Sequence, residues 1–246
     1  MPSVKNAKLA WDELNQAIEG CRRCPRLVKH CQTVAAVKRA AYVEEAYWGK
    51  PVPNFGSAGA KVLIVGLAPG AHGANRTGRM FTGDRSGEWL FRALHRAGLA
   101  KLPSYQNTGD GQQLIDCAIT AVCHCAPPAN KPRPEEITNC QAFLERTWSL
   151  TRPQVVLTLG QIAWSQTFQF AKRNQWWQGP IPRFGHGAAV RLRNNQLAEK
   201  QQPAKHATTW VVGSFHPSQQ NTFTGRLTEK MLDSVLAEVC KLKKNQ

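Results

Sequence analysis

The chain has 246 residues, 42% of them hydrophobic, which is enough for one large domain or two small ones around a sizeable core. Its formal net charge of +16 is spread along the chain, which favours a basic face that binds a polyanion such as nucleic acid, although a solvated basic surface is the plainer interpretation. No apolar run approaches the ~18 residues of a membrane span, and the first residues lack the apolar core of a signal peptide, so we expect a cytoplasmic protein, nucleoid-associated if bacterial, that does not bind membranes.

The predicted elements alternate between helices and strands. Helical spacing over 9–20 stops at Gly20, and four short apolar runs, most of them rich in β-branched residues, predict buried strands. This alternation predicts an α/β fold in three layers, α/β/α, with a central, mainly parallel four-stranded sheet in a single domain over 1–246. In such a sheet, ligands bind beyond the C-terminal ends of the strands. The predicted strands are 61–68, 114–122, 154–160 and 208–214, and the further predicted helices are 87–97, 134–150 and 161–170.

A polar segment over 171–207 interrupts this alternation. It is rich in Gln and Asn and contains Pro180, Pro182 and Pro203. Because polar composition with several prolines is typical of loops, we expect a long surface insertion here.

Eight cysteines in a chain expected to lie in the reducing cytosol suggest metal ligation more than disulfides. Two pairs carry this signal, Cys21-x2-Cys24 and, about a hundred residues later in the chain, Cys125-x14-Cys140. A CxxC turn can place two sulfurs on one side of a metal, so the four thiolates predict one structural metal site that ties the N-terminus to the core. From spacing alone, zinc and an iron–sulfur cluster are equal candidates. The other cysteines, Cys31, Cys117, Cys123 and Cys240, are expected to be small apolar residues, with Cys123 the main rival to Cys125.

A glycine-rich loop follows the first predicted strand of the sheet. Residues 66–87 contain six glycines, which let the backbone bend tightly and approach a ligand. A phosphate-binding P-loop is disfavoured because the loop has no Gly-Lys-Ser/Thr ending, and a dinucleotide fingerprint fails because the next helix begins only near Gly87. Asp84 in this loop is either a functional carboxylate or the cap of that helix.

A histidine stands at the end of the last predicted strand. His216 is followed by a proline that makes the loop rigid, which leaves the imidazole well placed to donate a hydrogen bond, although a structural role is commoner for a lone histidine. The polar run after it, as far as Thr228, suits either a loop pressed into a nucleic-acid groove or a solvated loop.

Four motifs in this order carry a resemblance to a known family. They are Gly-x-Ala-Pro-Gly from Gly66, Gly-Arg-Met-Phe-Thr-Gly-Asp from Gly78, Cys-Ala-Pro-Pro-x-Asn-Lys-Pro from Cys125, and His-Pro-Ser-x-x-Asn-x-x-Thr-Gly-Arg-Leu-Thr from His216. Together with the four paired cysteines, these motifs make the chain resemble the uracil-DNA glycosylase superfamily, and most closely its family 5 iron–sulfur branch. The resemblance runs from the first cysteine to about residue 232.

The resemblance implies an enzyme that flips a damaged base out of the duplex and hydrolyses its bond to deoxyribose. Bond breaking builds positive charge on the sugar and negative charge on the base, so the site needs an anion near the sugar and hydrogen-bond donors near the base oxygens. By resemblance, Asp84 is the catalytic carboxylate, His216 donates to a base oxygen, and Asn130 positions water or helps to hold the sugar. The alternative role for Asn130 is that of a turn residue.

The resemblance also implies a pocket for the flipped base. Phe81 would stack on the base. Alternatively, Phe81 is a core residue that closes the loop. Other branches of the superfamily carry Asp or Asn where this chain has Ala68, and several place a base-reading Asn where Ala121 stands. A pocket without that amide pair cannot strongly select uracil, so we expect removal of other deaminated bases such as hypoxanthine as well. The residues expected to line the pocket are Ala68, Pro69, Gly70, His72, Phe81 and Ala121.

The same resemblance implies the contacts with DNA and the cofactor. The 219–221 stretch would enter the minor groove and fill the space left by the flipped base, and arginines would contact phosphates. A 4Fe–4S cluster would be held by Cys21, Cys24, Cys125 and Cys140. We expect a monomer that acts mainly on double-stranded DNA; the alternative is a non-catalytic nucleic-acid-binding protein stabilised by iron–sulfur or zinc. The expected DNA contacts are Arg79, Arg85, Gln219, Gln220, Asn221 and Arg226.

Overall fold

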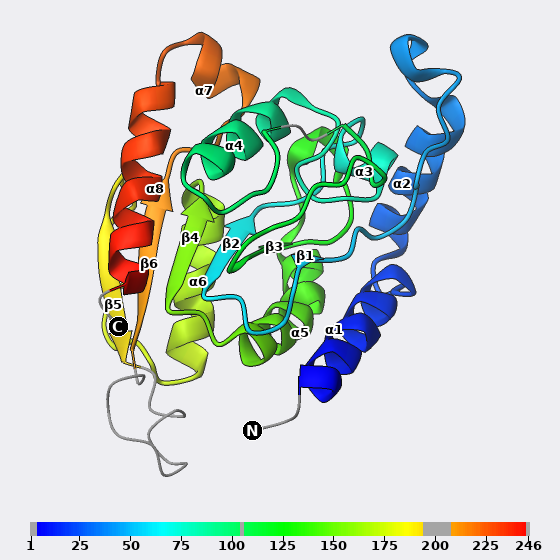
Figure 1. The fold of residues 1–246 in the computed structure, drawn as a ribbon. Helices are drawn as coiled ribbons and strands as arrows, with labels where there is room; N and C mark the ends of the chain where they lie inside the picture. The colour runs from blue at the N-terminus through cyan, green and yellow to red at the C-terminus, as the bar shows by residue number, and fades with distance from the viewer. Residues whose placement is uncertain (1–3, 104–105, 194–207, 245–246) are drawn as a thin grey trace.

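The structure is a computed structural model that describes residues 4–103, 106–193 and 208–244. A six-stranded sheet lies between layers of helices (Figure 1), in the order β1-β3-β2-β4-β6-β5. The four central strands are parallel, which confirms the predicted parallel core, and the two edge strands are antiparallel to their neighbours. The strands are β1 (Phe55–Gly56), β2 (Val62–Gly66), β3 (Cys117–Ala121), β4 (Val155–Leu159), β5 (Ala189–Arg193) and β6 (Thr208–Ser214).

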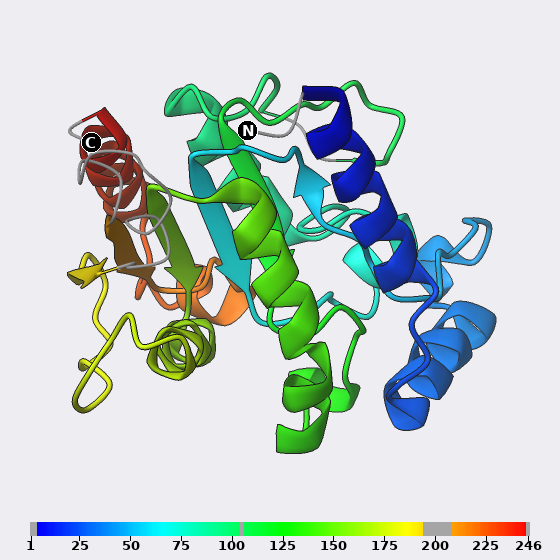
Figure 2. The ribbon, with the colours of Figure 1, turned by 90° about the horizontal axis from the view of Figure 1, so that it is seen from below.

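Helices cover both faces of this sheet. In Figure 2, α6 and α8 lie on opposite sides of the strands. Because both faces are covered, every residue of β2, β3 and β4 is buried, which explains why these strands read as continuous apolar runs. The helices are α1 (Val4–Glu19), α2 (Pro25–Val37), α3 (Ala74–Thr77), α4 (Arg85–Arg96), α5 (Pro134–Thr151), α6 (Gln161–Arg173), α7 (Gln219–Phe223) and α8 (Glu229–Lys244), with the short 3₁₀ turns η1 (Ala40–Tyr42) and η2 (Pro128–Asn130).

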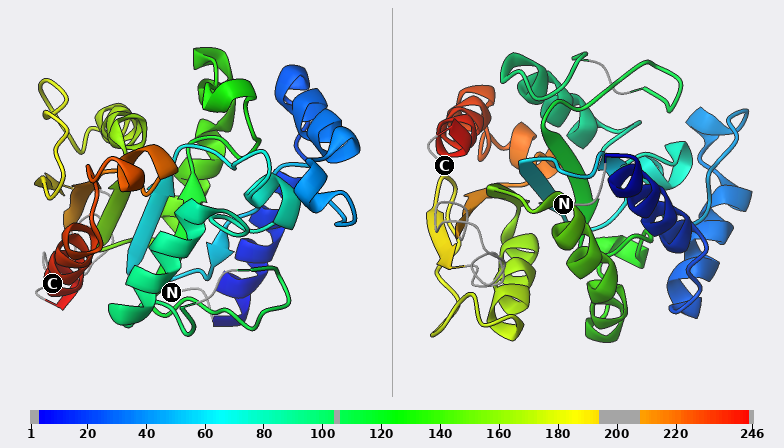
Figure 3. Two further views of the ribbon diagram at one scale, coloured as in Figure 1. Left: turned by 90° about the horizontal axis from the view of Figure 1, so that it is seen from above. Right: turned by 60° about the horizontal axis from the view of Figure 1, so that its bottom comes forward.

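The N-terminal helices α1 and α2 form one flank of the molecule. Figure 3 shows them together at the end of the molecule away from α8. The buried side chains of Leu14 and Ile18 pack α1 into the same core as Phe143 of α5. The chain between α1 and α2 carries Cys21 and Cys24. This flank therefore places the CxxC turn near the start of α5.

The 171–207 segment differs from the expected surface insertion. Its first residues complete α6, and residues 189–193 form β5, an edge strand paired antiparallel with β6. Between them, Trp176 is buried and its ring lies 5.5 Å from that of Trp148. Part of the segment thus belongs to the core and the sheet, and its remainder, 194–207, lies outside the described residues.

None of the helices in the described ranges is both long enough and apolar enough to cross a membrane.

Candidate active site

The C-terminal ends of β2, β3 and β6 open onto one cavity of about 260 Å³. Its walls are the loops that follow these three strands, which is where a parallel sheet is expected to bind its ligand. The structure brings together here the three predicted catalytic residues and most of the predicted base pocket. The lining residues are Gly66, Leu67, Ala68, Pro69, Gly70, Ala74, Met80, Phe81, Asp84, Ser86, Ala121, Asn130, His216 and Ser218.

Asp84 both caps α4 and lines the cavity. One carboxylate oxygen, Oδ1, accepts a 2.9 Å hydrogen bond from the backbone N–H of Gly87. The other oxygen, Oδ2, lies against two glycines of the loop: a Cβ at Gly70 would be 3.0 Å from it, and a Cβ at Gly73 only 2.2 Å. The loop therefore needs glycine at both positions to admit the carboxylate, and capping α4 does not remove Asp84 from the cavity.

Arg76 is a charged residue of this site that the sequence analysis missed. Its buried guanidinium donates to the carbonyl oxygen of Gly83 at 2.7 Å, one residue before Asp84, and forms an ion pair with Glu45. Burial raises the pKa of Asp84 above its ordinary value, while the backbone N–H donors at the start of α4 and the charge of Arg76 oppose that rise. Arg76 thus holds the loop in place and favours the ionised carboxylate.

His216 lies across the cavity beside Phe81, with 5.8 Å between the ring centroids. Desolvation lowers the pKa of His216 to about 4, so the imidazole is neutral at pH 7 and can donate from only one nitrogen. Asn221 fixes the loop, because its Nδ2 donates to the backbone oxygen of His216 at 2.8 Å. A neutral donor held in this way can stabilise a developing anion without adding a full charge to the resting site.

Phe81 has a backbone conformation that a phenylalanine rarely adopts, with φ of 53°. Its ring lies against the end of β2, where a Cβ at Gly66 would come within 3.0 Å of it. The same ring packs against the core and lines the cavity. A strained residue that presents a ring to a cavity is consistent with a stacking role.

Asn130 is the exposed residue at the end of η2. It and Ala129 both have left-handed backbones, with φ of 55° and 54°. Two consecutive residues in this region are unfavourable for side chains other than Gly, Asn or Asp. This turn places Asn130 on the wall of the cavity, so a turn residue and a lining residue are the same residue here.

Two predicted site residues lie elsewhere. His72 is outside the cavity lining and its Nδ1 is 2.9 Å from the hydroxyl of Tyr47. Arg79 is buried, with 2.8 and 2.6 Å bonds to the two carboxylate oxygens of Asp110 and a third bond from its Nε to Thr82. A guanidinium whose donors are used inside the protein is not available to a phosphate, so the predicted DNA contact of Arg79 is wrong.

The other predicted DNA contacts lie at the start of α4 and in or just after α7, and Asn221 among them is half-buried with its amide bonded to His216. Arg85, Gln219, Gln220 and Arg226 are exposed. Arg85 stands between the lining residues Asp84 and Ser86, and the two glutamines begin α7 directly after Ser218. Among the lining residues that sequence reasoning missed, Ser218 had a signal, because it belongs to the His-Pro-Ser motif. The others are Gly66, Leu67, Ala74, Met80 and Ser86.

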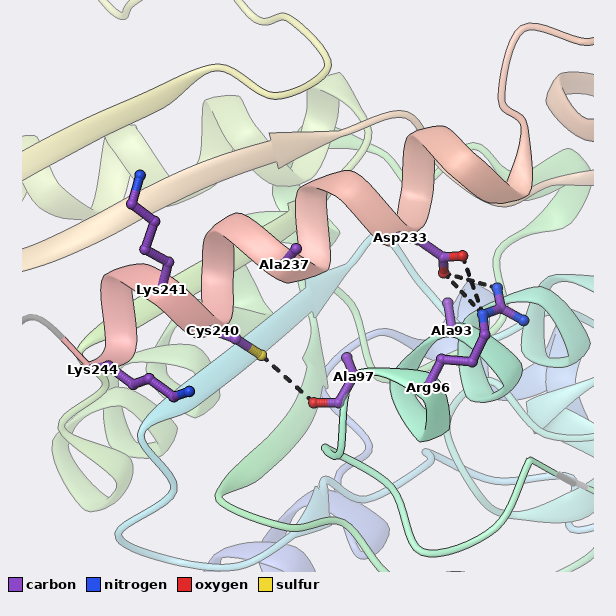
Figure 4. A pocket seen from close by; sticks show the side chains of 8 residues that line it. All are labelled: Ala93, Arg96, Ala97, Asp233, Ala237, Cys240, Lys241 and Lys244. Atoms are coloured by element: carbon purple, nitrogen blue, oxygen red, sulfur yellow. Dashed lines mark hydrogen bonds and ion pairs between the residues drawn. The ribbon is translucent and has the colours of Figure 1, made fainter.

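A larger cavity of about 570 Å³ lies between α4 and α8 (Figure 4). It is lined mainly by small and basic side chains, and its one carboxylate, Asp233, is 2.8 Å from the guanidinium of Arg96. The thiol of Cys240 donates to the backbone oxygen of Ala97 at 3.7 Å. With no free carboxylate or imidazole in its lining, this cavity is not suited to the glycosidic chemistry considered above.

The four predicted cluster ligands come from three separate parts of the fold. Cys21 and Cys24 stand between α1 and α2, Cys125 stands between β3 and η2, and Cys140 lies in α5. The guanidinium of Arg23, between Cys21 and Cys24, donates to the backbone oxygen of Asn139 at 2.9 Å, which brings the CxxC turn beside Cys140. That the four thiols form one metal site stays a prediction.

The surroundings of this quartet suit thiolate ligation. The amide nitrogen of Asn139 donates to Sγ of Cys24 at 3.4 Å, a contact of the kind that supports a metal-bound sulfur. Cys31 and Cys123 lie beside the quartet: Cys31 forms a thiol contact with Cys125, and Cys123 forms one with Cys140. In the described residues no group of three or more Cys, His, Asp or Glu side chains is arranged to hold a single metal ion. Four cysteine thiolates are the donor set that a 4Fe–4S cluster uses, with one sulfur bound to each iron, and the same set also suits a single zinc ion.

The sequence of the chain is similar to those of known proteins of one family. The sequence profile described as the uracil DNA glycosylase superfamily matches residues 53–240, which include the three loops of the cavity. The chain is 46% identical over 232 residues to the type-5 uracil-DNA glycosylase of Mycobacterium tuberculosis, covering 94% of this chain and 81% of that protein. It is similarly related to the type-5 enzymes of Mycobacterium leprae (46% identity, 94% of each chain) and Thermus thermophilus (42% identity, 92% of this chain and 95% of that protein).

The chain therefore belongs to the uracil DNA glycosylase superfamily, and within it to the type-5 uracil-DNA glycosylases.

Proposed function

We propose that the protein removes uracil, and other deaminated bases such as hypoxanthine, from DNA by hydrolysing the bond between base and deoxyribose, which leaves an abasic site. One observation carries this proposal: Asp84, Asn130 and His216, from loops after three different strands, meet in one cavity. The names of the type-5 relatives support uracil as a substrate.

The chemistry follows from where charge develops. A base flipped into the cavity stacks on Phe81. As the glycosidic bond breaks, the carboxylate of Asp84 stabilises the positive charge on the sugar, and the neutral imidazole of His216 donates a hydrogen bond to the departing base. Asn130 on the third wall holds the attacking water or the sugar.

Base selection is broad in this proposal because two positions of the lining are alanines. Ala68 and Ala121 offer the base no side-chain hydrogen bond. Strong discrimination needs a buried polar group that the wrong base would leave unpaired, and these positions supply none. The test is a panel of duplexes that carry uracil, hypoxanthine or thymine at one position. Removal of uracil alone would contradict the broad range.

We further propose that Cys21, Cys24, Cys125 and Cys140 hold a 4Fe–4S cluster. When bound, such a cluster would link α1, the β3 loop and α5 through covalent iron–sulfur bonds. The chain's own residues support it through the Asn139 donor to Cys24. The cluster braces the segment from Cys125 to Asn130 and takes no part in the chemistry. A brown protein with four irons per chain is expected, and a colourless one with one zinc would contradict it.

The proposed substrate is mainly double-stranded DNA, bound by a monomer. Exposed Arg85, between the lining residues Asp84 and Ser86, and exposed Arg226, over the ring of Phe215, supply phosphate contacts, and the net charge of +16 supplies salt-dependent affinity for undamaged DNA. A DNA-repair enzyme of this kind works in the cytoplasm or the nucleoid. The decisive assay is strand cleavage by alkali after incubation with a duplex that contains one uracil; wild-type protein that binds this duplex and leaves it intact would contradict the proposed function.

A further inference from the structure

Helix α2, the turn η1 and the chain as far as Glu45 form an arm with an uneven charge. Residues 20–43, which include the CxxC turn, α2 and η1, contain six Lys and Arg side chains and no Asp or Glu. A basic run of this kind favours a polyanionic partner, because each phosphate that it neutralises releases counterions. The six cations are Arg22, Arg23, Arg26, Lys29, Lys38 and Arg39.

Three of these cations are used near the CxxC turn. Arg26 forms an ion pair with Glu136, and the guanidinium groups of Arg22 and Arg23 donate to backbone oxygens. Further along the arm, Lys29 in α2 and Arg39 at the start of η1 are exposed. These two cations are therefore the ones that the arm presents to a partner.

The exposed face of α2 carries hydrogen-bond donors and no carboxylate. Leu27 and Cys31 are the residues that this helix buries. On the opposite side, Lys29, Gln32 and Thr33 are exposed and lie within one turn of each other. Lys, Gln and Thr side chains are all donors to DNA phosphates, so the composition of this face suits a DNA backbone.

The tip of the arm presents a cation between apolar side chains. Val37 is 76% exposed and Val43 is 54% exposed, and Arg39 stands between them in the chain. The Nζ of Lys38 donates to the backbone oxygen of Val43 at 2.7 Å, which closes the tip into a turn. One cation with apolar surface on both sides suits a DNA strand, in which charged phosphates alternate with the apolar edges of the sugars.

The arm rises on the same side of the sheet as the candidate active site. Figure 1 shows α2 and α7 both beyond the C-terminal ends of the strands, with α3 between them, and the view from above in Figure 3 shows the same order. The cavity is lined by Ala74 of α3 and by Ser218, directly before α7. The arm and α7 therefore stand on opposite sides of the cavity.

Arg76 of α3 joins the arm to the catalytic loop. Its guanidinium lies 4.0 Å from the ring centroid of Tyr42, forms an ion pair with Glu45, and donates to the backbone oxygen of Gly83. Its own backbone oxygen accepts from the N–H of Trp48 at 2.8 Å. A phosphate bound by the arm would therefore be held at a fixed position relative to the loop that carries Asp84.

We propose that this arm is a second DNA-binding surface, on which Lys29 and Arg39 hold phosphates of the duplex on the side of the cavity away from α7. The inference rests on the proposed glycosylase function and adds where the flanking duplex lies. Phosphate contacts carry no sequence information, but they fix the register and orientation of the protein on the duplex. The arm would thus position the damaged nucleotide over the cavity without reading the base.

The test compares wild type with the double variant Lys29→Gln/Arg39→Gln. Lys61→Gln/Lys101→Gln is the matched control, because it removes the same charge from exposed lysines at the opposite edge: Lys61 directly precedes β2, and the N–H of Lys101 donates to the backbone oxygen of Gln113, shortly before β3. Affinity is measured at several salt concentrations for two duplexes, one extending from the uracil mainly to the 5′ side and the other mainly to the 3′ side. The sugar of the uracil nucleotide is fluorinated so that the base stays in place.

We expect Lys29→Gln/Arg39→Gln to reduce the slope of log affinity against log salt by about 2 on one of the two duplexes, since each lost phosphate contact removes about one unit. The other duplex, and both duplexes with the control variant, should keep the wild-type slope. Thermal melting should show that both variants are folded.

Two results would overturn the arm as a DNA contact. An equal loss on both duplexes, matched by the control, would show a diffuse effect of net charge, and no loss on either duplex would show that another partner or solvent covers this face. Wild-type protein that binds both duplexes but removes no uracil from their unfluorinated forms would instead overturn the proposed function.

Discussion

Replacement of Asp84 separates its two roles, because one carboxylate oxygen caps α4 and the residue also lines the cavity. In Asp84→Asn the amide oxygen can still accept from Gly87, but the negative charge is gone. In Asp84→Ala both are lost.

The expected loss of rate follows from the charge. Two unit charges about 4 Å apart at an effective dielectric constant of about 20 interact by about 4 kcal/mol, and about half a unit of charge on the sugar gives about 2 kcal/mol. At 1.36 kcal/mol per factor of ten, Asp84→Asn should therefore act about 30-fold more slowly than wild type, and about 1,000-fold more slowly if a full unit of charge develops on the sugar.

The expected change in stability differs between the two variants. Loss of the cap in Asp84→Ala should cost about 1 kcal/mol, or about 2–4 °C in Tm for a chain of this size. Burial raises the pKa of Asp84, so ionisation of this carboxyl lowers the free energy of unfolding at any pH above that pKa. The neutral Asp84→Asn should therefore be no less stable than wild type at pH 7.

Single-turnover alkali-cleavage assays and thermal melts on the three proteins measure both effects. Two slow variants, of which only Asp84→Ala melts early, would support the catalytic role. If both variants kept the wild-type rate, or if Asp84→Asn lost activity only in step with a lower Tm, the reasoning about the charge would be refuted.

Four further predictions concern the pH dependence of the rate, the pH dependence of stability, the interior arginine and the cluster. The rate should fall as the pH drops through the raised pKa of Asp84, because the carboxylate is then protonated; a pH–rate profile with no acidic limb above the ordinary aspartate range would contradict this. Burial lowers the pKa of His216 to about 4, so the free energy of unfolding should decrease as the pH falls from about 6.5 toward that value, and denaturant titrations should show a weaker dependence in His216→Gln. Arg79→Met removes the charged partner of Asp110, whose carboxylate still accepts from the backbone N–H groups of Gln106 and Gln112, so it should destabilise the fold by about 1–3 kcal/mol without changing the salt dependence of DNA binding. Exposed Arg85→Met should instead reduce that salt slope by about 1 and leave Tm unchanged; the opposite pattern would restore Arg79 as a DNA contact. Cys125→Ser should lose iron and thermal stability together, with Cys117→Ser in the core strand as the control that keeps its iron; a Cys125→Ser protein with full iron content would point to Cys123 or Cys31 as the ligand.

The central sheet was predictable because burial on both faces leaves an unmistakable pattern. The apolar runs that become β2, β3, β4 and β6 each lie in the predicted ranges, with ends shorter by a few residues in most cases. Helix α8 was missed although Leu232, Val235, Leu236 and Val239 recur at helical spacing and are all buried. That signal could have been found.

Other elements had no readable signal. Helix α2 buries only Leu27 and Cys31, too little for an apolar stripe, and β1 has two residues. Strand β5 buries only Leu192, because its outer face is open to solvent at the sheet edge. Local composition therefore described 171–207 as a loop, whereas pairing with β6 makes part of it a strand.

The candidate site likewise contains residues that the sequence predicts and residues that it does not. Motif order was enough to name Asp84, Asn130 and His216, since each follows a strand whose C-terminal end was predictable. Arg79 and Arg76 are both arginines of the glycine loop, and their roles depend on Asp110 and Glu45, 31 residues away in each case. A partner at that separation in an irregular loop leaves no local pattern in the sequence. The ion pairs of these two arginines could therefore be identified only from the structure.

The most direct measurement is the product of the reaction. Purified wild-type protein should release free uracil from a duplex that carries a single uracil, in an amount equal to the alkali-labile sites formed in the same strand, and Asp84→Asn should form both products more slowly by the same factor. Release of no free base, or strand breaks that form without alkali and without free uracil, would contradict hydrolysis of the glycosidic bond at this site.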